Sequence, residues 1–323
     1  MTSAPSMQSL VQEYLDERRR LGFALAIPGT QLLSFARFAD GAGHRGPLTV
    51  QLAMSWAQQG GRRAAPATWA RRLDVVRPFA RHCAQVEPGT EVPDADLFSH
   101  KRQRPTPHIY TAAEIADLLA AARRLPPVGT LRPLTYEAFF GLVAATGLRL
   151  SEALRLRCAD LNAGSGMLTI RQTKFCKSRL VPLHPTAAAA LAQYLAARQR
   201  RASTAPDAPF FVSPSGGALT KRTVHGVFAR LRAELGWAAR GTLPSPRIHD
   251  LRHSFVCRRV ALWHEAGADI DNAMLALSTY VGHAKVSDTY WYLTAVPDLM
   301  AVAAGRFEQF AAVAADVGEV RHG

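Results

Sequence analysis

In the first 85 residues, apolar side chains recur every three or four positions, which is the spacing of one face of an α-helix. Leu10, Val11, Tyr14 and Leu15 show this spacing first. The pattern predicts helices over residues 8–19, 30–39, 49–59 and 67–84. We expect Pro78 to kink or split the last helix, because proline lacks a backbone donor and its ring clashes with the preceding turn. The chain is therefore predicted to begin with a small helical bundle.

The next stretch has no apolar period. Prolines 88, 93, 105 and 107 interrupt residues 86–108, and such a composition is typical of a connection between domains. A capping box at Thr111 and Glu114 then begins a new helix. We therefore predict a helical domain at residues 1–87, a basic connector at 88–108 and a second domain at 109–323.

The second domain combines helices with one hairpin. Helices are predicted at residues 133–146, 151–157, 186–201, 220–235, 250–265, 271–281, 286–293 and 297–315. Residues 167–171 alternate between apolar and polar, as a half-buried strand does, and residues 180–183 form its partner. The tip of this hairpin is expected at residues 175–178. The predicted fold class is mainly α with a small β-hairpin or sheet (α+β), in two domains.

Charge points to a polyanionic partner. The 323 residues include 39 Lys and Arg against 25 Asp and Glu, a net charge of +14, and the isoelectric point is near 10.4. Only five of the basic residues are lysines, and guanidinium groups favour bidentate contacts with phosphate. Nucleic acid is thus the first candidate partner and an anionic membrane surface the second.

Several classes of protein are disfavoured. The four cysteines (Cys83, Cys158, Cys176 and Cys257) lack the paired spacing of a zinc site or a disulfide framework, so we expect reduced thiols and no metal. The first twenty residues are too charged for a secretion signal, and the apolar run at 187–197 is too short to cross a bilayer. We expect a cytoplasmic protein that acts without a membrane or a cofactor.

Five short stretches carry residues suited to attack on a phosphate. They are Thr146 to Glu152, Thr173-Lys174, His249 to His253, Gly282-His283 and Thr289 to Tyr292. Metal-free cleavage of a phosphodiester needs cations for the non-bridging oxygens, a nucleophile and an acid for the leaving oxygen. Arg149 and Arg252 are the candidate cations, because arginine stays charged and presents a planar fork to two oxygens.

The third of these stretches belongs to a predicted helix. His249, Arg252 and His253 share one side of it, while Leu251 and Phe255 fall on a different side. We therefore expect the polar group to lie free of the core. Taken alone, a motif this short is more often a helix start at His249 and an ordinary surface position at Arg252.

The acid and the nucleophile each have two candidates. Lys174 ends the first strand, where it could donate a proton to a leaving oxygen, and Lys177 is its rival. Tyr292 lies nine residues after His283, and Tyr290 is the alternative. A tyrosine suits the role because a phosphotyrosyl ester conserves the energy of the broken bond.

Together, and in this order, the motifs resemble the catalytic domain of the tyrosine recombinases of the phage-integrase family, over about residues 106–310. The helical bundle is similar in character to the core-binding domain of that family. The resemblance implies an active site of Arg149, Lys174, His249, Arg252, His283 and Tyr292, with Glu152 supporting Arg149. Phe175 and Cys176 depart from the pattern, since glycine usually stands beside the hairpin lysine.

The resemblance also implies the reaction. Tyr292 would attack DNA to give a 3′-phosphotyrosyl enzyme, without metal or ATP, and strands would exchange through a Holliday junction in a tetrameric synapse on double-stranded DNA, alone or with partner recombinases. The residues expected to contact DNA are Arg71, Arg72, Arg81, Lys101, Arg102, Arg104 and Lys177. The connector lysine and arginines among them equally fit a solvated linker.

Three matters remain open from the sequence. The last helix, at residues 297–315, has an apolar face that could dock on a neighbouring protomer or on its own domain.

A mobile-element integrase or transposase is favoured over a type IB topoisomerase because a separate bundle precedes a compact catalytic domain. A DNA-binding or architectural protein on the same fold would lack a catalytic residue, and none is missing; a metal-dependent transposase is disfavoured by the scattered carboxylates.

Overall fold

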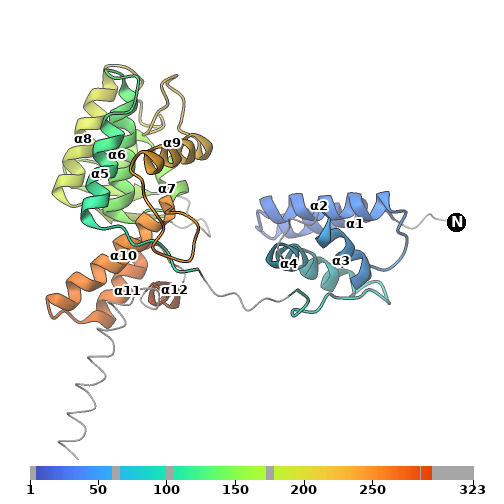
Figure 1. Ribbon diagram of the computed structural model, residues 1–323. Coiled ribbons are helices and arrows are strands. Elements are labelled where there is room, and N and C mark those ends of the chain that lie inside the picture. Colours follow the sequence, from blue (N-terminus) through green and yellow to red (C-terminus); the bar gives the residue numbers. More distant parts are fainter. Residues whose placement is uncertain (1–4, 60–65, 99–104, 172–177, 284, 293–323) are drawn as a thin grey trace, which may run out of the picture. The chain divides into compact units, whose positions relative to one another are not determined.

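The computed structural model divides into two compact units, Met1–Arg104 and Pro105–Gly323 (Figure 1). It describes residues 5–59, 66–98, 105–171, 178–283 and 285–292. Both units are built from helices, and the second also contains a three-stranded sheet, which confirms the predicted fold class. No helix among the described residues is both long and apolar enough to cross a membrane.

The first unit is a bundle of helices around one core. Its elements are α1 (Met7–Arg20), α2 (Ala26–Gly41), α3 (Val50–Gln58) and α4 (Pro66–Cys83). Each contributes fully buried or nearly buried apolar side chains, such as Leu15, Phe35, Trp56 and Phe79. Helix α4 continues through Pro78, so of the two predicted effects the split is wrong, and the kink stays a prediction. The remaining turns of this helix are held by the apolar residues that it packs into the core, which outweigh one missing backbone hydrogen bond.

The segment after α4 packs onto this bundle. The buried Arg77 donates hydrogen bonds to the carbonyl oxygens of Pro93 (3.0 Å) and Asp94 (2.6 Å). Leu97 and Phe98 pack against the core of the same unit. Residues 91–98 are thus tied to the bundle, whereas residues 99–104, with Lys101, Arg102 and Arg104, lie outside the described residues.

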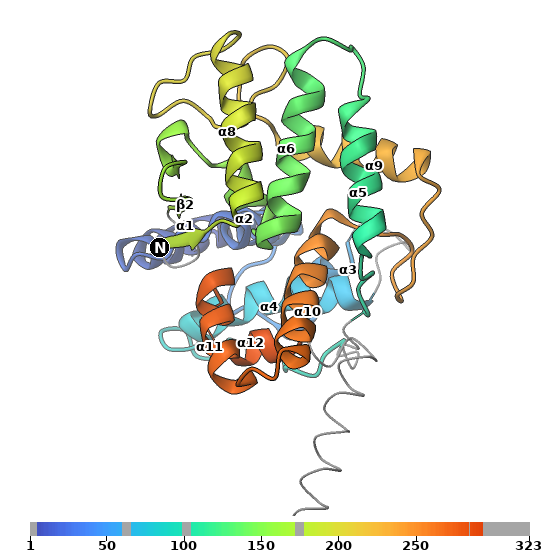
Figure 2. The ribbon, with the colours of Figure 1, turned by 90° about the vertical axis from the view of Figure 1, so that its left-hand side faces the viewer.

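The second unit is larger and begins with the predicted capping box, in which Thr111 and Glu114 each accept the other's backbone N–H. Its helices are α5 (Ala112–Arg123), α6 (Leu131–Thr146), α7 (Leu150–Leu154), α8 (Pro185–Gln199), α9 (Lys221–Glu234), α10 (Ile248–Glu265), α11 (Ile270–Val281) and α12 (Ser287–Tyr290), with a 3₁₀ turn, η1 (Cys158–Asp160). Figure 2 shows α5, α6 and α8 side by side, with α10 and α11 at the end of α6.

An antiparallel sheet in the order β1-β2-β3 completes this unit. Its strands are β1 (Leu161–Asn162), β2 (Met167–Ile170) and β3 (Arg179–Pro182). The predicted hairpin of β2 and β3 is confirmed, with Ile170 opposite Arg179 at its last described pair. The sequence did not predict β1, because two residues are too few to show an alternation. The hairpin tip at 172–177, with Lys174 and Lys177, lies outside the described residues.

Gly147 connects α6 to the region of the candidate motifs. It ends α6 in the left-handed conformation, with φ of 62°. A Cβ at this position would lie 2.6 Å from the Phe255 ring of α10, so both the backbone and the close approach require glycine. The tight packing of α6 against α10 places the carbonyl of Gly147 beside Arg252.

Candidate active site

Arg252 of α10 is the organising side chain of the site. It is 1% exposed. Its Nε donates to the Tyr292 hydroxyl (3.3 Å), and its Nη1 donates to the Gly147 carbonyl (2.7 Å). Its Nη2 donates to the Val281 carbonyl and to Nε2 of His283, both at 2.8 Å. One guanidinium group therefore joins α10 to the turn at Gly147, to the end of α11 and to Tyr292.

The expectation that His249, Arg252 and His253 lie free of the core is wrong for two of the three. Arg252 and His253 are buried, at 1% and 4% exposed, and only His249 is exposed. The reason is that α11 and Tyr292 pack against this side of α10, with Val256 and Met274 in the same apolar cluster. The apolar spacing of α10 alone does not reveal this second packing partner.

Arg149 stands at the N-terminus of α7 beside a buried carboxylate. Its backbone N–H donates to Oε2 of Glu152 (3.0 Å) and its Nη1 donates to Oε1 (2.9 Å). Its Nη2 donates to the Gly282 carbonyl (2.8 Å). The Arg149 side chain is 30% exposed, whereas that of Glu152 is 1% exposed. Arg149 is thus held from one side and faces outward on the other.

Arg179, at the start of β3, also binds Glu152, and sequence reasoning missed it. Its Nη1 and Nη2 donate to Oε1 (3.2 Å) and Oε2 (3.0 Å) of the carboxylate, and its Nε donates to the Tyr280 carbonyl (2.8 Å). Burial would raise the pKa of Glu152, but the Arg179 and Arg149 guanidinium groups hold it below its ordinary value. In the sequence Arg179 is only a basic residue at the edge of a strand, and its partner is 27 residues away.

His283 follows the end of α11 and is held in one tautomer. A guanidinium can only donate, so Nε2 of His283 accepts from Arg252, and the ring proton lies on Nδ1. Nδ1 donates to the Thr289 hydroxyl at 2.7 Å. Burial, and then the charges of Arg252 and Arg149, lower the pKa of His283 to about 4. The ring is therefore neutral at physiological pH.

Tyr292 reaches the site from the end of α12. It is 5% exposed, and its ring stacks on His283 with centroids 5.6 Å apart. Its carbonyl accepts a hydrogen bond from the Cys257 thiol (3.6 Å). Tyr290, the alternative nucleophile, is 38% exposed. Of the two hydroxyls, that of Tyr292 is the one bonded to Arg252.

Two further histidines of α10 flank Tyr292. The His253 ring lies 4.6 Å from that of Tyr292 and 5.0 Å from that of His249, between centroids. Burial and then the His249 charge lower the pKa of His253 to about 3. Loss of hydration at the inner edge of the exposed His249, followed by the charges of Arg252 and Arg247, also lowers its pKa.

These shifts predict how stability depends on pH. The folded-state pKa values of His253 and His283 lie below the ordinary 6.5, so the unfolded chain takes up protons first as the pH falls. The contribution of these two histidines to the free energy of unfolding should therefore be largest above pH 6.5 and decrease between about pH 6.5 and 3. His253→Phe keeps a buried ring without a titrating group and should reduce the decrease between pH 7 and 5, measured by urea unfolding. His225→Gln, at an exposed position on α9, serves as the control, and an unchanged decrease in His253→Phe would contradict the assignment.

The expected DNA-binding residues of the described part lie on α4. Arg71 and Arg81 are exposed. Arg72 instead donates to the carbonyls of Ala57 (2.9 Å) and Gln59, so its guanidinium caps the end of α3. Among the described residues, no cluster of His, Cys, Asp and Glu could hold a metal ion.

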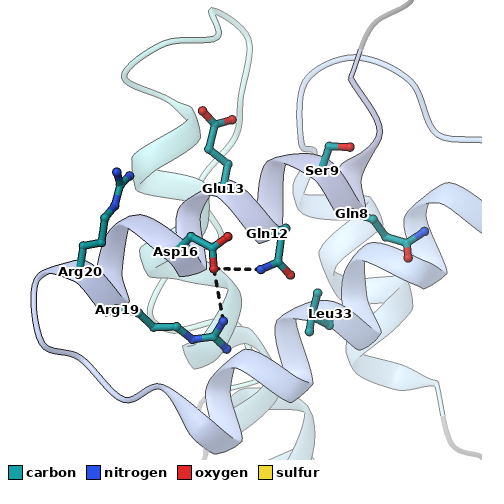
Figure 3. Close-up of a pocket in the computed structure, with 8 residues that line it drawn as sticks. All are labelled: Gln8, Ser9, Gln12, Glu13, Asp16, Arg19, Arg20 and Leu33. Carbon is teal, nitrogen blue, oxygen red and sulfur yellow. Dashed lines mark hydrogen bonds and ion pairs between the residues drawn. The ribbon is translucent and has the colours of Figure 1, made fainter.

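A surface pocket lies on the first unit, on the outer face of α1 (Figure 3). Its polar groups pair with each other, since Asp16 accepts from Gln12 (2.9 Å) and from Arg19 (3.4 Å). The pocket is open and Leu33 of α2 forms part of its wall. The candidate catalytic groups belong to the second unit, and none of them lines this pocket.

Comparison with known proteins agrees with the motifs. The family model described as "Phage integrase family" matches residues 108–297. A protein named as an integrase/recombinase, y4rB of Sinorhizobium fredii, is 40% identical over 94% of this chain and 98% of its own length. The tyrosine recombinase XerD of Xanthomonas campestris pv. campestris is 31% identical over 88% of this chain and 83% of its own length.

Solved structures share the fold. The Tn1549 transposon integrase in complex with transposon right end DNA has a TM-score of 0.67 at 16% identity, and the alignment covers 94% of this chain and 99% of that one. The XerH site-specific recombinase bound to its difH substrate after cleavage has a TM-score of 0.64 at 17% identity, covering 93% and 85%. The chain therefore belongs to the phage integrase family and is a tyrosine recombinase, an enzyme that breaks and rejoins DNA.

Proposed function

We propose that Tyr292 is the nucleophile of this recombinase and that Arg149, Arg252 and His283 surround the scissile phosphate. The observation that carries the proposal is the hydrogen bond from Nε of the buried Arg252 to the Tyr292 hydroxyl. It places a phenol oxygen beside the cation that would bind a non-bridging oxygen. A buried arginine stabilises a developing negative charge more strongly than an arginine in water does, because the local dielectric constant is lower.

Arg149 is the group best placed to meet the phosphate first. It is the more exposed of the two catalytic arginines, and its Nε donates to no described residue. Four of the five N–H groups of Arg252 donate to described residues, and the Nε–H that now binds Tyr292 is the one that would turn to the phosphate. Exchange of that bond also releases the Tyr292 oxygen for attack.

We propose the following bond changes. The Tyr292 oxygen would attack phosphorus while the bond from phosphorus to the 5′ oxygen breaks, which gives a 3′-phosphotyrosyl ester and a 5′ hydroxyl. His249 would accept the phenol proton, and Lys174 would donate a proton to the 5′ oxygen, with Lys177 as the alternative donor. Attack by another 5′ hydroxyl on the ester reverses the chemistry and joins strands without an external energy source.

We infer that this chemistry serves strand exchange on double-stranded DNA. Four protomers would assemble a synapse in which the strands exchange through a Holliday junction. The protein would act in the cytoplasm, on the DNA of the nucleoid. The printed titles of the XerH and Tn1549 structures describe proteins bound to DNA, and the net charge of +14 here suits such a partner. Integration or transposition of a mobile element is the proposed role. The helix predicted at residues 297–315 would join protomers, and the basic residues Lys101, Arg102 and Arg104 would contact DNA; both segments lie outside the described residues.

Covalent trapping tests the proposal. The full chain is mixed with nicked duplexes built from the DNA that flanks its gene, so that the cleaved fragment diffuses away and the ester accumulates. The expected result is a denaturant-resistant adduct whose DNA-linked peptide contains Tyr292. An adduct at Tyr290 would move the nucleophile, relaxation of supercoils without joining of two sites would favour a topoisomerase, and specific binding without any adduct would favour an architectural protein.

A further inference from the structure

Three arginines from three elements bind three consecutive carbonyls. The Tyr280 carbonyl accepts from Arg179, the Val281 carbonyl from Arg252 and the Gly282 carbonyl from Arg149, each at 2.8 Å. These carbonyls lie at the C-terminal end of α11 and on the residue after it. The helix stops there, so no further turn supplies backbone N–H donors for them. The negative end of a helix dipole favours cations at this place. One turn of backbone therefore fixes the guanidinium groups of both catalytic arginines and of Arg179.

Arg179 and Arg149 both bind the Glu152 carboxylate and together offset its negative charge. The carboxylate accepts four hydrogen bonds, of which two come from the Arg179 guanidinium and two from Arg149. Two guanidinium groups bind this one carboxylate, and the Glu152 side chain is buried enough for the three charges to act strongly on each other. Without Arg179, the full negative charge of Glu152 would rest on Arg149 and offset the positive charge that Arg149 offers to a phosphate.

The turn before His283 is shaped around Arg179. Gly282 has φ of 72°, and a Cβ there would lie 2.7 Å from Nη1 and 2.8 Å from Cζ of Arg179. The Arg179 guanidinium therefore lies directly on the Gly282 backbone. Because Arg179 is also the first residue of β3, it joins the base of the lysine hairpin to the turn that presents His283.

We propose that Arg179 is a positioning residue for DNA cleavage, which neutralises Glu152 so that Arg149 remains cationic toward the phosphate and which fixes the hairpin base against the end of α11. The proposal rests on the proposed role of Arg149 at the scissile phosphate. Arg179 acts through Glu152 and through backbone, and its side chain is only 11% exposed.

The experiment compares Arg179→Gln, Arg179→Lys and the double variant Glu152→Gln/Arg179→Gln in the full chain. Single-turnover formation of the covalent adduct is measured on the nicked duplex, DNA affinity on the intact duplex, and folding by thermal melting. Arg155→Gln, at an exposed position after α7, is the matched control. Arg179→Gln should slow cleavage about a hundredfold with DNA affinity changed less than about threefold, because removal of one preorganised charge acts mainly on the transition state.

The conservative and double variants separate positioning from mere support of the fold. Arg179→Lys restores the charge without the fork and should recover part of the rate. In the double variant the buried negative charge is gone, so cleavage should be about tenfold or more faster than in Arg179→Gln alone. A purely structural role instead predicts that the two losses add and that rates follow the folded fraction.

The outcomes also distinguish this inference from the function on which it rests. If the wild type forms the adduct and Arg179→Gln forms it at the same rate, the inference about Arg179 is overturned and the recombinase chemistry stands. If the double variant is no faster than Arg179→Gln, the charge-sharing role is overturned. If the wild type forms no adduct, the proposed roles of Tyr292 and Arg149 fall, and that of Arg179 falls with them.

Discussion

Tyr292→Phe should lower covalent DNA cleavage by at least about a thousandfold, because a phenylalanine ring has no oxygen to attack phosphorus. The substitution keeps the ring that stacks on His283 and packs beside His253. It removes one hydrogen bond, which is the long one from Arg252 at 3.3 Å. Folding and DNA affinity should therefore remain close to those of the wild type.

The measurement is adduct formation on the nicked duplex, with fluorescence anisotropy for affinity. Tyr290→Phe is the matched control, since it removes a hydroxyl only two residues away on an exposed side chain. The control should cleave at nearly the wild-type rate. Adduct formation by Tyr292→Phe, or its loss in Tyr290→Phe, would show that the nucleophile has been assigned to the wrong tyrosine.

The second large effect distinguishes the two arginines that we propose to be catalytic. Arg149→Gln and Arg252→Gln should each lower cleavage by about a hundredfold or more, because each removes a cation from the phosphate site. Only Arg252→Gln should also destabilise the fold strongly. It leaves the Gly147 and Val281 carbonyls without their donors, and each buried unpaired group costs about 1–3 kcal/mol.

Urea unfolding of the two variants measures this difference. We expect the free energy of unfolding to fall by about 2–6 kcal/mol in Arg252→Gln, from two such unpaired groups. In Arg149→Gln the decrease should be smaller, because that side chain is 30% exposed and Glu152 keeps its bidentate partner Arg179. Equal losses of stability would mean that Arg252 is not the more structural of the two.

Much of this architecture can be predicted from the sequence where the signal is local. Helical spacing located most of the helices, the capping box at Thr111 fixed the start of α5, and alternation located β2 and β3. The ordered motifs indicated a tyrosine recombinase, which the family match confirms. The pairing of Arg149 with Glu152 is also local, since the two residues are three apart at the start of a helix.

The unpredicted features depend on contacts between distant segments. The burial of Arg252 and His253 follows from α11 and Tyr292, which return to cover α10 only after the chain has turned. The role of Arg179 depends on its contacts with Glu152 and Tyr280, which are 27 and 101 residues away in the sequence. No pattern within one helix or strand contains such information, because the spacing of apolar residues reports which face is buried but not which polar groups meet behind it.

The three arginines of this site depend on the same few backbone carbonyls at the end of α11, so they should be ordered or released together. Arg179, Arg252 and Arg149 have no common secondary structure, but the carbonyls of residues 280–282 hold them all. A local opening of that one turn would release the three side chains at once, and with them the orientation of His283. Native-state hydrogen exchange should then find a single opening free energy for this region, and conditions that loosen the turn should switch catalytic competence off in one step instead of weakening it gradually.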